Sequence, residues 1–416
     1  MSTHQYFGPE LRRLRLEAGL TLTEFSQALH YDKGHLSKVE RGERPPSPEL
    51  ARRCDAFLGA NGELQGLISV TGATTDAAEG PAVPGPWLVA HESVLAAGTA
   101  TAPTPGRRAP LADPASSAAG LLLPSLRAQF DLLRKLGQST APGVLLPLLE
   151  TQTRMVARLA ADASSAARAP ALLLASRFAE FTGWMAQEAG DIGAALGWTG
   201  EAAELARAGG DPHLSSYALV RRALVTLYSG DAPATITLAA RAQGGSLPPR
   251  IRGLAAQREA QGHALAGDEL GCRRSLDKAR ELLDRDDARS GAEPVIGTTH
   301  VEDPAAMTSG WCLYDLGRPA AAAEILDREC RRLPPHALRT RARYGFRRSL
   351  AHAASGEVEQ ACTIAGELLG VMPTVPSATV NSDVRRLARE LSRFRSSPVV
   401  RELQPGLARV LAPENG

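Results

Sequence analysis

The stretch GLTLTEFSQALHYDKGHLSKVERGERPPS, residues 19–47, decides the fold of the N-terminal part of this 416-residue chain. Thr21 and Glu24 stand three apart, and this T-x-x-E spacing predicts a capping box at the start of a helix. Asp32 can cap a second helix over residues 33–41. The stretch therefore predicts two short helices joined by a tight turn.

Further helices are predicted on both sides of this stretch. Residues 9–18 alternate leucines with arginines in an amphipathic pattern that Gly19 closes. Ser47 followed by Pro48 is typical of a helix start, with a serine cap and proline in the first turn. A compact unit of four to five helices is expected over residues 7–68.

The stretch resembles the helix-turn-helix of the phage-repressor or Xre-type family, and the resemblance extends from about residue 7 to residue 67. The capping box, the inter-helix turn, the ERG ending and the R-x-P-S start all fall at family spacing. The sequence departs at the turn, where the family usually has glycine followed by an aliphatic residue. His30 and Tyr31 stand there instead, so we expect slightly different helix packing.

In that family the third helix enters the major groove of double-stranded DNA and the second crosses the phosphate backbone. The resemblance implies base contacts from Lys33, Gly34, His35, Ser37 and Lys38. It implies backbone contacts from Leu22, Thr23, Arg41 and Arg44. The alternative is a protein-binding helical unit of the same fold.

The charges of this unit are nearly balanced. Between residues 9 and 45 seven basic residues stand against six acidic ones, and the whole chain has a net charge of +2. Such a balance does not by itself argue for nucleic-acid binding. DNA affinity would depend on where the charges point and on two copies binding together, so a homodimer is expected.

The composition predicts an all-α fold. Hydrophobic residues make up 44% of the chain but aromatic residues only 4%, so alanine and leucine must fill the core, and such cores favour helices. Residues 69–120 are rich in Ala, Pro and Gly and are expected to form a flexible linker. Residues 121–412 return to a helical pattern.

The C-terminal region contains an internal repeat. A glycine followed by a polar residue recurs at intervals of 37 to 50 residues, at Gly190, Gly230, Gly267, Gly317 and Gly356. Small residues stand seven before each glycine (Gly183, Ala223, Ala260, Gly310, Ser349) and five after it (Ala195, Thr235, Cys272, Ala322, Ala361). Each glycine is expected to end one helix, and the small residues to let two antiparallel helices cross closely.

This repeat resembles the tetratricopeptide repeat over roughly residues 170–370, although the period and the weak aromatic positions depart from that family. The resemblance implies an α-solenoid of helix pairs, with a further diverged pair over residues 121–161 and a terminal cap over 384–411. The alternative is a generic alanine-rich helical bundle.

In tetratricopeptide domains the first helix of each pair lines a concave groove. Counting from the capping glycines, the matching positions are Arg177, Glu180, Trp184, Gln187, Tyr217, Gln257, Gln261, Met307, Trp311, Tyr314, Arg343 and Phe346. These side chains suit a peptide or a small-molecule ligand. The alternative is that the aromatic residues simply pack between repeats. Residues 284–304 exceed the repeat length and are a candidate segment to fold over the groove.

Other classes of protein are disfavoured. No apolar run approaches a membrane span and the N-terminus has no apolar signal-peptide core, so the protein is expected in the cytoplasm, associated with the nucleoid. The five cysteines are scattered without a CxxC pair, and we expect reduced thiols. No catalytic or metal-ligating constellation is visible, so we expect no enzyme, no cofactor and no metal.

The sequence thus predicts a transcriptional regulator that binds DNA through residues 7–68, while its repeat domain dimerises, senses a ligand, or both. The long linker favours control through the dimer interface over a twist transmitted to the DNA-binding unit. The alternative is a DNA-tethered scaffold that recruits a partner protein through its repeats.

Overall fold

The computed structural model describes residues 4–60, 62–69, 114–285, 296–297 and 299–412, and the regular secondary structure in these ranges is entirely helical. The predicted all-α fold is therefore confirmed. Most of the stretch expected to be a linker, residues 70–113, lies outside the described residues. None of the helices in the described ranges combines the length and the apolar character needed to cross a membrane.

The N-terminal helices pack around one small core. They are α1 (His4–Glu17), α2 (Leu22–Ala28), α3 (Lys33–Glu40), α4 (Pro48–Leu58) and α5 (Glu63–Ser69). Phe7, Phe25 and Leu36 are fully buried where α1, α2 and α3 meet. The predicted capping box begins α2, because the Glu24 backbone N–H donates to Thr21 Oγ1 over 3.2 Å and the Thr21 N–H donates to Glu24 Oε2 over 2.8 Å.

The turn between α2 and α3 differs from a glycine turn in one respect. His30 adopts a positive φ of 50°, and it is the only non-glycine residue in the described ranges that does so. Histidine is among the residues that tolerate this left-handed region best. Histidine thus occupies a left-handed turn position here, and Tyr31 follows it as a partly buried side chain that packs against the core.

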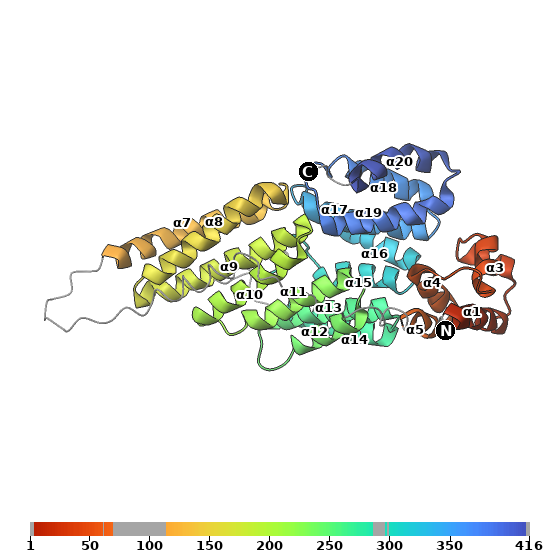
Figure 1. Cartoon of the computed structure of the whole chain (residues 1–416), viewed down its shortest axis with the longest axis horizontal. Helices are drawn as coiled ribbons and strands as arrows, with labels where there is room; N and C mark the ends of the chain where they lie inside the picture. The colour runs from red at the N-terminus through yellow and green to blue at the C-terminus, as the bar shows by residue number, and fades with distance from the viewer. Residues whose placement is uncertain (1–3, 61, 70–113, 286–295, 298, 413–416) are drawn as a thin grey trace, which may run out of the picture.

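The C-terminal region is built from antiparallel helix pairs that follow one another along the molecule (Figure 1). The helices are α7 (Pro114–Leu136), α8 (Pro142–Asp162), α9 (Ser165–Ala189), α10 (Ile192–Ala208), α11 (Leu214–Tyr228), α12 (Ala232–Arg241), α13 (Pro249–Ala266), α14 (Glu269–Asp284), α15 (Pro304–Asp315), α16 (Pro319–Arg331), α17 (Leu338–Ala354), α18 (Val358–Leu369), α19 (Ala378–Leu391), the 3₁₀ turn η2 (Ser392–Phe394) and α20 (Pro398–Leu411). Helix α7 thus begins ahead of residue 121, where the helical region was expected to start.

The five repeat glycines lie between the two helices of five successive pairs, from α9–α10 to α17–α18. Their φ values lie between 78° and 91°, a region in which only glycine is unstrained. The helices cross closely at the small residues. A Cβ at Gly183 would lie 3.1 Å from the Ala195 carbonyl oxygen, and Ser349 Oγ donates to the Ala361 carbonyl over 2.8 Å. The predicted helix pairs are confirmed.

The N-terminal helices lie at one end of the elongated molecule and α7 and α8 at the other (Figure 1). The N-terminal helices contact the inter-helix turns of the α15–α16 and α17–α18 pairs. A Cβ at Gly317 would lie 2.6 Å from Ala56 Cβ, and one at Gly356 would lie 2.9 Å from His30 Cε1. Glycine at these two positions therefore permits both the positive φ and the close approach of the N-terminal domain.

Polar contacts join the two regions as well. Arg53 on α4 forms an ion pair with Glu390 (3.1 Å) and also donates to the Ala354 carbonyl. From the other side, Arg393 donates to the Leu29 carbonyl over 3.1 Å. The Arg393 guanidinium also stacks 3.8 Å from the centre of the Tyr31 ring. The long linker led us to expect weak rigid coupling between the two regions, whereas in the structure they share a packed interface.

Candidate nucleic-acid interface and interior pocket

Helix α3 is fixed to α1 by a buried ion pair. Arg15 Nε lies 2.6 Å from Glu40 Oε1 and Arg15 Nη2 lies 2.9 Å from Glu40 Oε2, and both side chains are less than one-tenth exposed. Arg15 also donates to the Leu20 carbonyl over 2.7 Å. The carboxylate of Glu40 raises the pKa of Arg15, so the guanidinium stays charged. This pair holds the C-terminal end of α3 in one orientation relative to the rest of the domain.

The predicted base-contact residues lie on the free face and edge of α3. Lys33, Gly34 and Lys38 are exposed, whereas His35 and Ser37 are partly buried. Burial, together with the nearby cation of Arg44, lowers the pKa of His35, so its ring is neutral at pH 7. Ser37 Oγ accepts a hydrogen bond from Arg41 Nη1 over 2.6 Å. The two lysines are therefore the cations of this helix that face solvent.

The residues predicted to contact the DNA backbone differ in their exposure to solvent. Thr23, Arg41 and Arg44 are exposed, but Leu22 is partly buried. Arg41 is held by Glu43, with Nε 2.6 Å from Oε1. Such exposed pairs are weak and can open when a phosphate is offered instead.

The pairing pattern decides which cations of the N-terminal domain are free. Within the described residues, four exposed basic side chains make no ion pair: Arg12, Lys33, Lys38 and Arg44. Arg12 was not among the predicted contacts. Its sequence neighbours distinguish it from Arg13, because Arg13 has Glu10 and Glu17 at helical spacing and pairs with both.

A pocket lies inside the C-terminal domain, where the first helices of five successive pairs converge. Its volume is about 160 Å³, and α9, α11, α13, α15 and α17 all contribute side chains to its wall. The lining is completed by Arg134 near the end of α7, by Gln138 in the turn after it, and by Gly297 and His300. Residues 286–295 of the excess segment are outside the described residues, but its described end lies against the pocket.

Half of the predicted groove residues line this pocket: Glu180, Trp184, Tyr217, Gln257, Trp311 and Arg343. The other half do not line it: Arg177, Gln187, Gln261, Met307, Tyr314 and Phe346. Phe346 is fully buried in the core, as the packing alternative predicted, and Met307 is fully buried there as well. Arg177 pairs with Asp211 (3.2 Å), Gln187 accepts from Arg221 (3.0 Å) and Gln261 is buried.

The prediction missed a row of pocket residues that lies nine positions before the capping glycines. This row contains Phe181, Arg221, Arg258 and Thr308, and all four line the pocket. Counting only the positions three, six, ten and thirteen residues before each glycine skipped it. Side chains three to four residues apart share a helix face. The missed row lies three residues before one predicted row and four residues after another, and this spacing was the signal that could have identified it.

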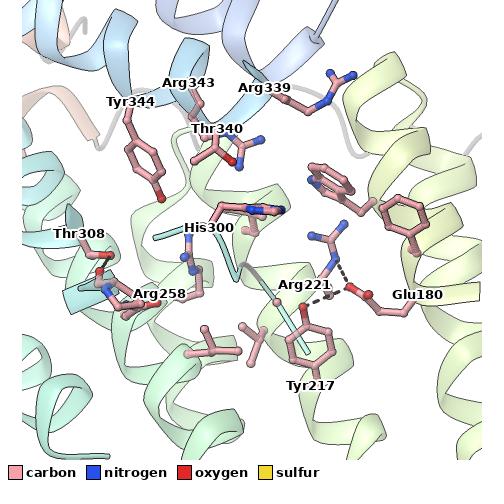
Figure 2. Close-up of a pocket in the computed structure, with 18 of the residues that line it drawn as sticks. Glu180, Tyr217, Arg221, Arg258, His300, Thr308, Arg339, Thr340, Arg343 and Tyr344 are labelled. Carbon is pink, nitrogen blue, oxygen red and sulfur yellow. Dashed lines mark hydrogen bonds and ion pairs between the residues drawn. The ribbon is translucent and has the colours of Figure 1, made fainter. Parts of the chain in front are cut away.

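The pocket wall carries an excess of cations. Figure 2 shows Arg221, Arg258 and Arg343 entering from different helices, with Glu180 beside Tyr217 and Arg221. The Tyr217 hydroxyl donates to Glu180 Oε1 over 3.2 Å, and Arg221 Nε lies 3.8 Å from the same oxygen.

A second acid, Glu188, lies behind the wall. It is fully buried, accepts a hydrogen bond from Arg343 and lies 3.7 Å from Arg339 Nη1. Burial alone would raise the pKa of Glu188, but the two guanidinium groups and the hydroxyls of Ser377 and Thr379 hold it below its ordinary value. Glu188 therefore stays ionised and fixes two of the pocket arginines.

The pocket is connected to the N-terminal domain through α15. Trp311 lines the pocket and donates from its indole Nε1 to Asp315 over 3.0 Å. Burial would raise the pKa of Asp315, but Arg386, Arg347 and Arg52 of α4 lower it. The neighbouring Tyr314 donates its hydroxyl to Glu49, also on α4.

Comparison with known proteins agrees with the N-terminal geometry. Residues 7–66 match a family model described as a helix-turn-helix domain. The chain therefore contains a helix-turn-helix domain, a class of DNA-binding domain, followed by a large all-helical C-terminal region. No curated protein matches this sequence significantly.

Proposed function

We propose that this chain is a sequence-specific transcriptional regulator of the Xre type that acts by binding rather than by catalysis. The observation that carries the proposal is α3 itself. The helix is anchored at one end by the buried Arg15–Glu40 pair and offers Lys33 and Lys38, both without ion-pair partners in the described residues, to solvent. Exposed lysines on a recognition helix can donate to guanine O6 and N7 in the major groove.

The test is capture of DNA from the protein's own genome. Fragmented genomic DNA is mixed with the full chain at moderate salt in the presence of competitor DNA, with and without cell extract, and the retained fragments are sequenced. We expect a small set of enriched sites. Retention of no fragment over competitor in either condition contradicts the proposal.

Dimerisation through α7 and α8 is the second part of the proposal. Each helix carries one stripe of exposed apolar side chains. On α7 the stripe is Leu121, Leu122, Leu132 and Leu136, and on α8 it is Val144, Leu148 and Met155. Their spacing puts each set on a single helix face. A contiguous exposed apolar surface is typical of an interface, and a second copy of the same surface is the simplest partner.

The test of dimerisation is the molar mass in solution. Light scattering of the full chain should give twice the chain mass, and Leu132→Glu should shift it toward the monomer. Leu270→Glu on α14 is the matched control, because Leu270 is equally apolar and exposed but lies outside the α7–α8 stripes. A monomeric wild-type protein contradicts this part of the proposal and leaves the DNA-binding part intact.

Ligand sensing by the helical domain is the third part. The pocket residue Trp311 and the α4 contact Tyr314 lie one turn apart on α15, and Arg343 and the Arg53 acceptor Ala354 both belong to α17. A ligand that moves α15 or α17 would therefore bias the contacts that hold the N-terminal domain. Mass spectrometry of the purified protein tests whether a ligand is retained.

A scaffold that recruits another protein is the second candidate function, and the same α7–α8 stripes favour it. The two candidates differ in what covers the stripes. A purified chain that remains monomeric and co-purifies with a stoichiometric partner supports the scaffold, whereas self-association supports the ligand-sensing dimer.

A further inference from the structure

The charges around the pocket do not balance. Its wall contains five arginines and one carboxylate, that of Glu180, and the pocket arginines are Arg134, Arg221, Arg258, Arg339 and Arg343. Glu188 adds a second negative charge from behind. An excess of about three positive charges remains in a largely enclosed space. Buried charges are stable only with a counter-charge, so the wall is complementary to an anion.

Arg258 is the pocket arginine left without a protein partner. Arg134 donates to the Gly297 carbonyl (2.9 Å), and Arg339 donates to the carbonyls of Gly137 and Thr140 (2.9 and 2.7 Å). Arg258 forms neither a hydrogen bond nor an ion pair with any residue that the structure describes. Burial lowers its pKa, but a guanidinium remains protonated at pH 7.

Two further donors at the pocket are also unpaired. The Tyr228 hydroxyl and the side-chain amide nitrogen of Gln257 are buried and have no hydrogen-bond partner. Both residues line the same pocket as Arg258. Three donor groups without acceptors indicate that the missing partner carries acceptor oxygens.

Much of the remaining wall is aromatic. Phe181, Trp184, Tyr217 and Trp311 line the pocket, and Trp311 and Tyr228 form an edge-to-face pair with ring centres 6.0 Å apart. Such walls accept a flat apolar group. The volume of about 160 Å³ sets the size of that group, because an engineered cavity of ~150 Å³ binds benzene. A single ring fits inside, whereas several peptide residues do not.

We propose that the pocket binds a small organic anion, a single aromatic ring bearing a carboxylate or a phosphate that pairs with Arg258 and accepts from Tyr228 and Gln257. This inference rests on the proposed signal-sensing function and gives its ligand a chemical class.

The experiment is isothermal titration of the full chain with three probes that share one ring. Phenylacetate carries a carboxylate, phenyl phosphate carries a phosphate, and phenylacetamide is the neutral counterpart of the first. We expect saturable binding of one or both anions at millimolar concentration, and binding at least about tenfold weaker for phenylacetamide. The stronger of the two anions identifies the acidic group. Equal binding of phenylacetamide, or no saturable binding of either anion, overturns the proposal.

Variants then locate the site. Arg258→Gln should weaken anion binding at least about tenfold, and Arg258→Lys should restore part of it. Arg252→Gln is the matched control, because Arg252 lies on the same helix, is also partly buried and does not line the pocket. Unchanged anion binding by a folded Arg258→Gln protein overturns the proposal. If that variant does not fold, the comparison of charged and neutral probes on the wild-type protein decides.

The titration is independent of DNA. Anion binding without retention of genomic fragments would contradict the proposed regulator but support the pocket assignment. Retention of fragments without anion binding would support the regulator and overturn the pocket assignment.

Discussion

The molecule presents its cations in two different ways. On the N-terminal domain Arg12, Lys33, Lys38 and Arg44 lie exposed and unpaired within the described residues. Around the pocket of the C-terminal domain the arginines are enclosed, and most are held by carboxylates or carbonyls. Exposed cations spread over a surface suit an extended polyanion such as DNA, because each phosphate contact releases counterions. Enclosed and oriented cations suit one small anion.

The difference also separates the two regions by their dependence on salt. Exposed charges are screened over about 10 Å at 0.1 M salt, whereas enclosed pairs are screened much less. Rising salt should therefore weaken DNA binding steeply and leave the pocket arginines in place. Four predictions test the roles of the enclosed and the exposed charged groups and of the contact between the two regions.

The largest effect is expected at Glu188. Glu188→Gln leaves Arg339 and Arg343 without their shared buried carboxylate. We expect the free energy of unfolding of the C-terminal domain to fall by about 3–5 kcal/mol, measured by chemical denaturation. Glu150→Gln removes an exposed carboxylate that pairs with Arg154 on α8, and it should change the same quantity by less than about 0.5 kcal/mol. Equal effects of the two substitutions would contradict the enclosed cluster.

The second effect concerns the exposed lysines. Lys33→Ala or Lys38→Ala should cost about 1–3 kcal/mol of preference for the operator over random duplex, measured by competition binding, if the lysine reads a base. Equal losses on both duplexes would assign that lysine to the phosphate backbone. Lys135→Ala on α7 is the control, because that lysine is exposed but distant in the fold, and it should leave both affinities unchanged.

The third effect is a loss of stability in acid. The pKa values of Glu188 and Asp315 lie below their ordinary 4.5 and 3.8 in the folded protein. The unfolded chain therefore binds more protons, so the stability from these carboxylates is present above those ordinary values and is lost as the pH falls through the folded pKa. We expect losses of up to ~1.4 kcal/mol per pH unit for each carboxylate. Thermal melting between about pH 5 and about pH 2 measures this, and Glu188→Gln should give a shallower dependence than the wild-type protein.

The smallest effect is expected at the contact between the two regions. Tyr314→Phe removes the hydroxyl that donates to Glu49 on α4. We expect a loss of about 0.5–1.5 kcal/mol in the stability of the interface, seen as a lower melting temperature of the N-terminal domain in calorimetry. Tyr6→Phe is the control, because Tyr6 is exposed on α1. An unchanged transition for Tyr314→Phe would mean that the contact contributes nothing in solution.

Local signals in the sequence were sufficient for the helices and their ends. The capping box at Thr21, the cap at Asp32 and the glycines at Gly190 and Gly356 each act within a few residues, and the structure confirms all of them. Only half of the predicted groove residues line the pocket, because the sequence indicates which helices face the groove but not how far each helix is rotated about its own axis. One row of side chains, which includes Arg258, was missed for that reason.

The interface between the two regions could not be predicted in the same way. Arg53 and Glu390 are 337 positions apart, and Leu29 and Arg393 are 364 apart. Nothing in either local pattern identifies the other partner. A buried arginine on α4 reads as an ordinary amphipathic position until the opposite surface is known.

A few side chains of the N-terminal domain form its contacts with the C-terminal domain. Glu49, Arg53 and His30 touch the C-terminal domain, yet none of them is among the residues expected to read DNA or to line the pocket. Substitutions at these positions can therefore change the strength of the coupling between the two regions, while the operator sequence and the ligand stay the same. Related chains could in this way inherit one specificity and diverge only in sensitivity.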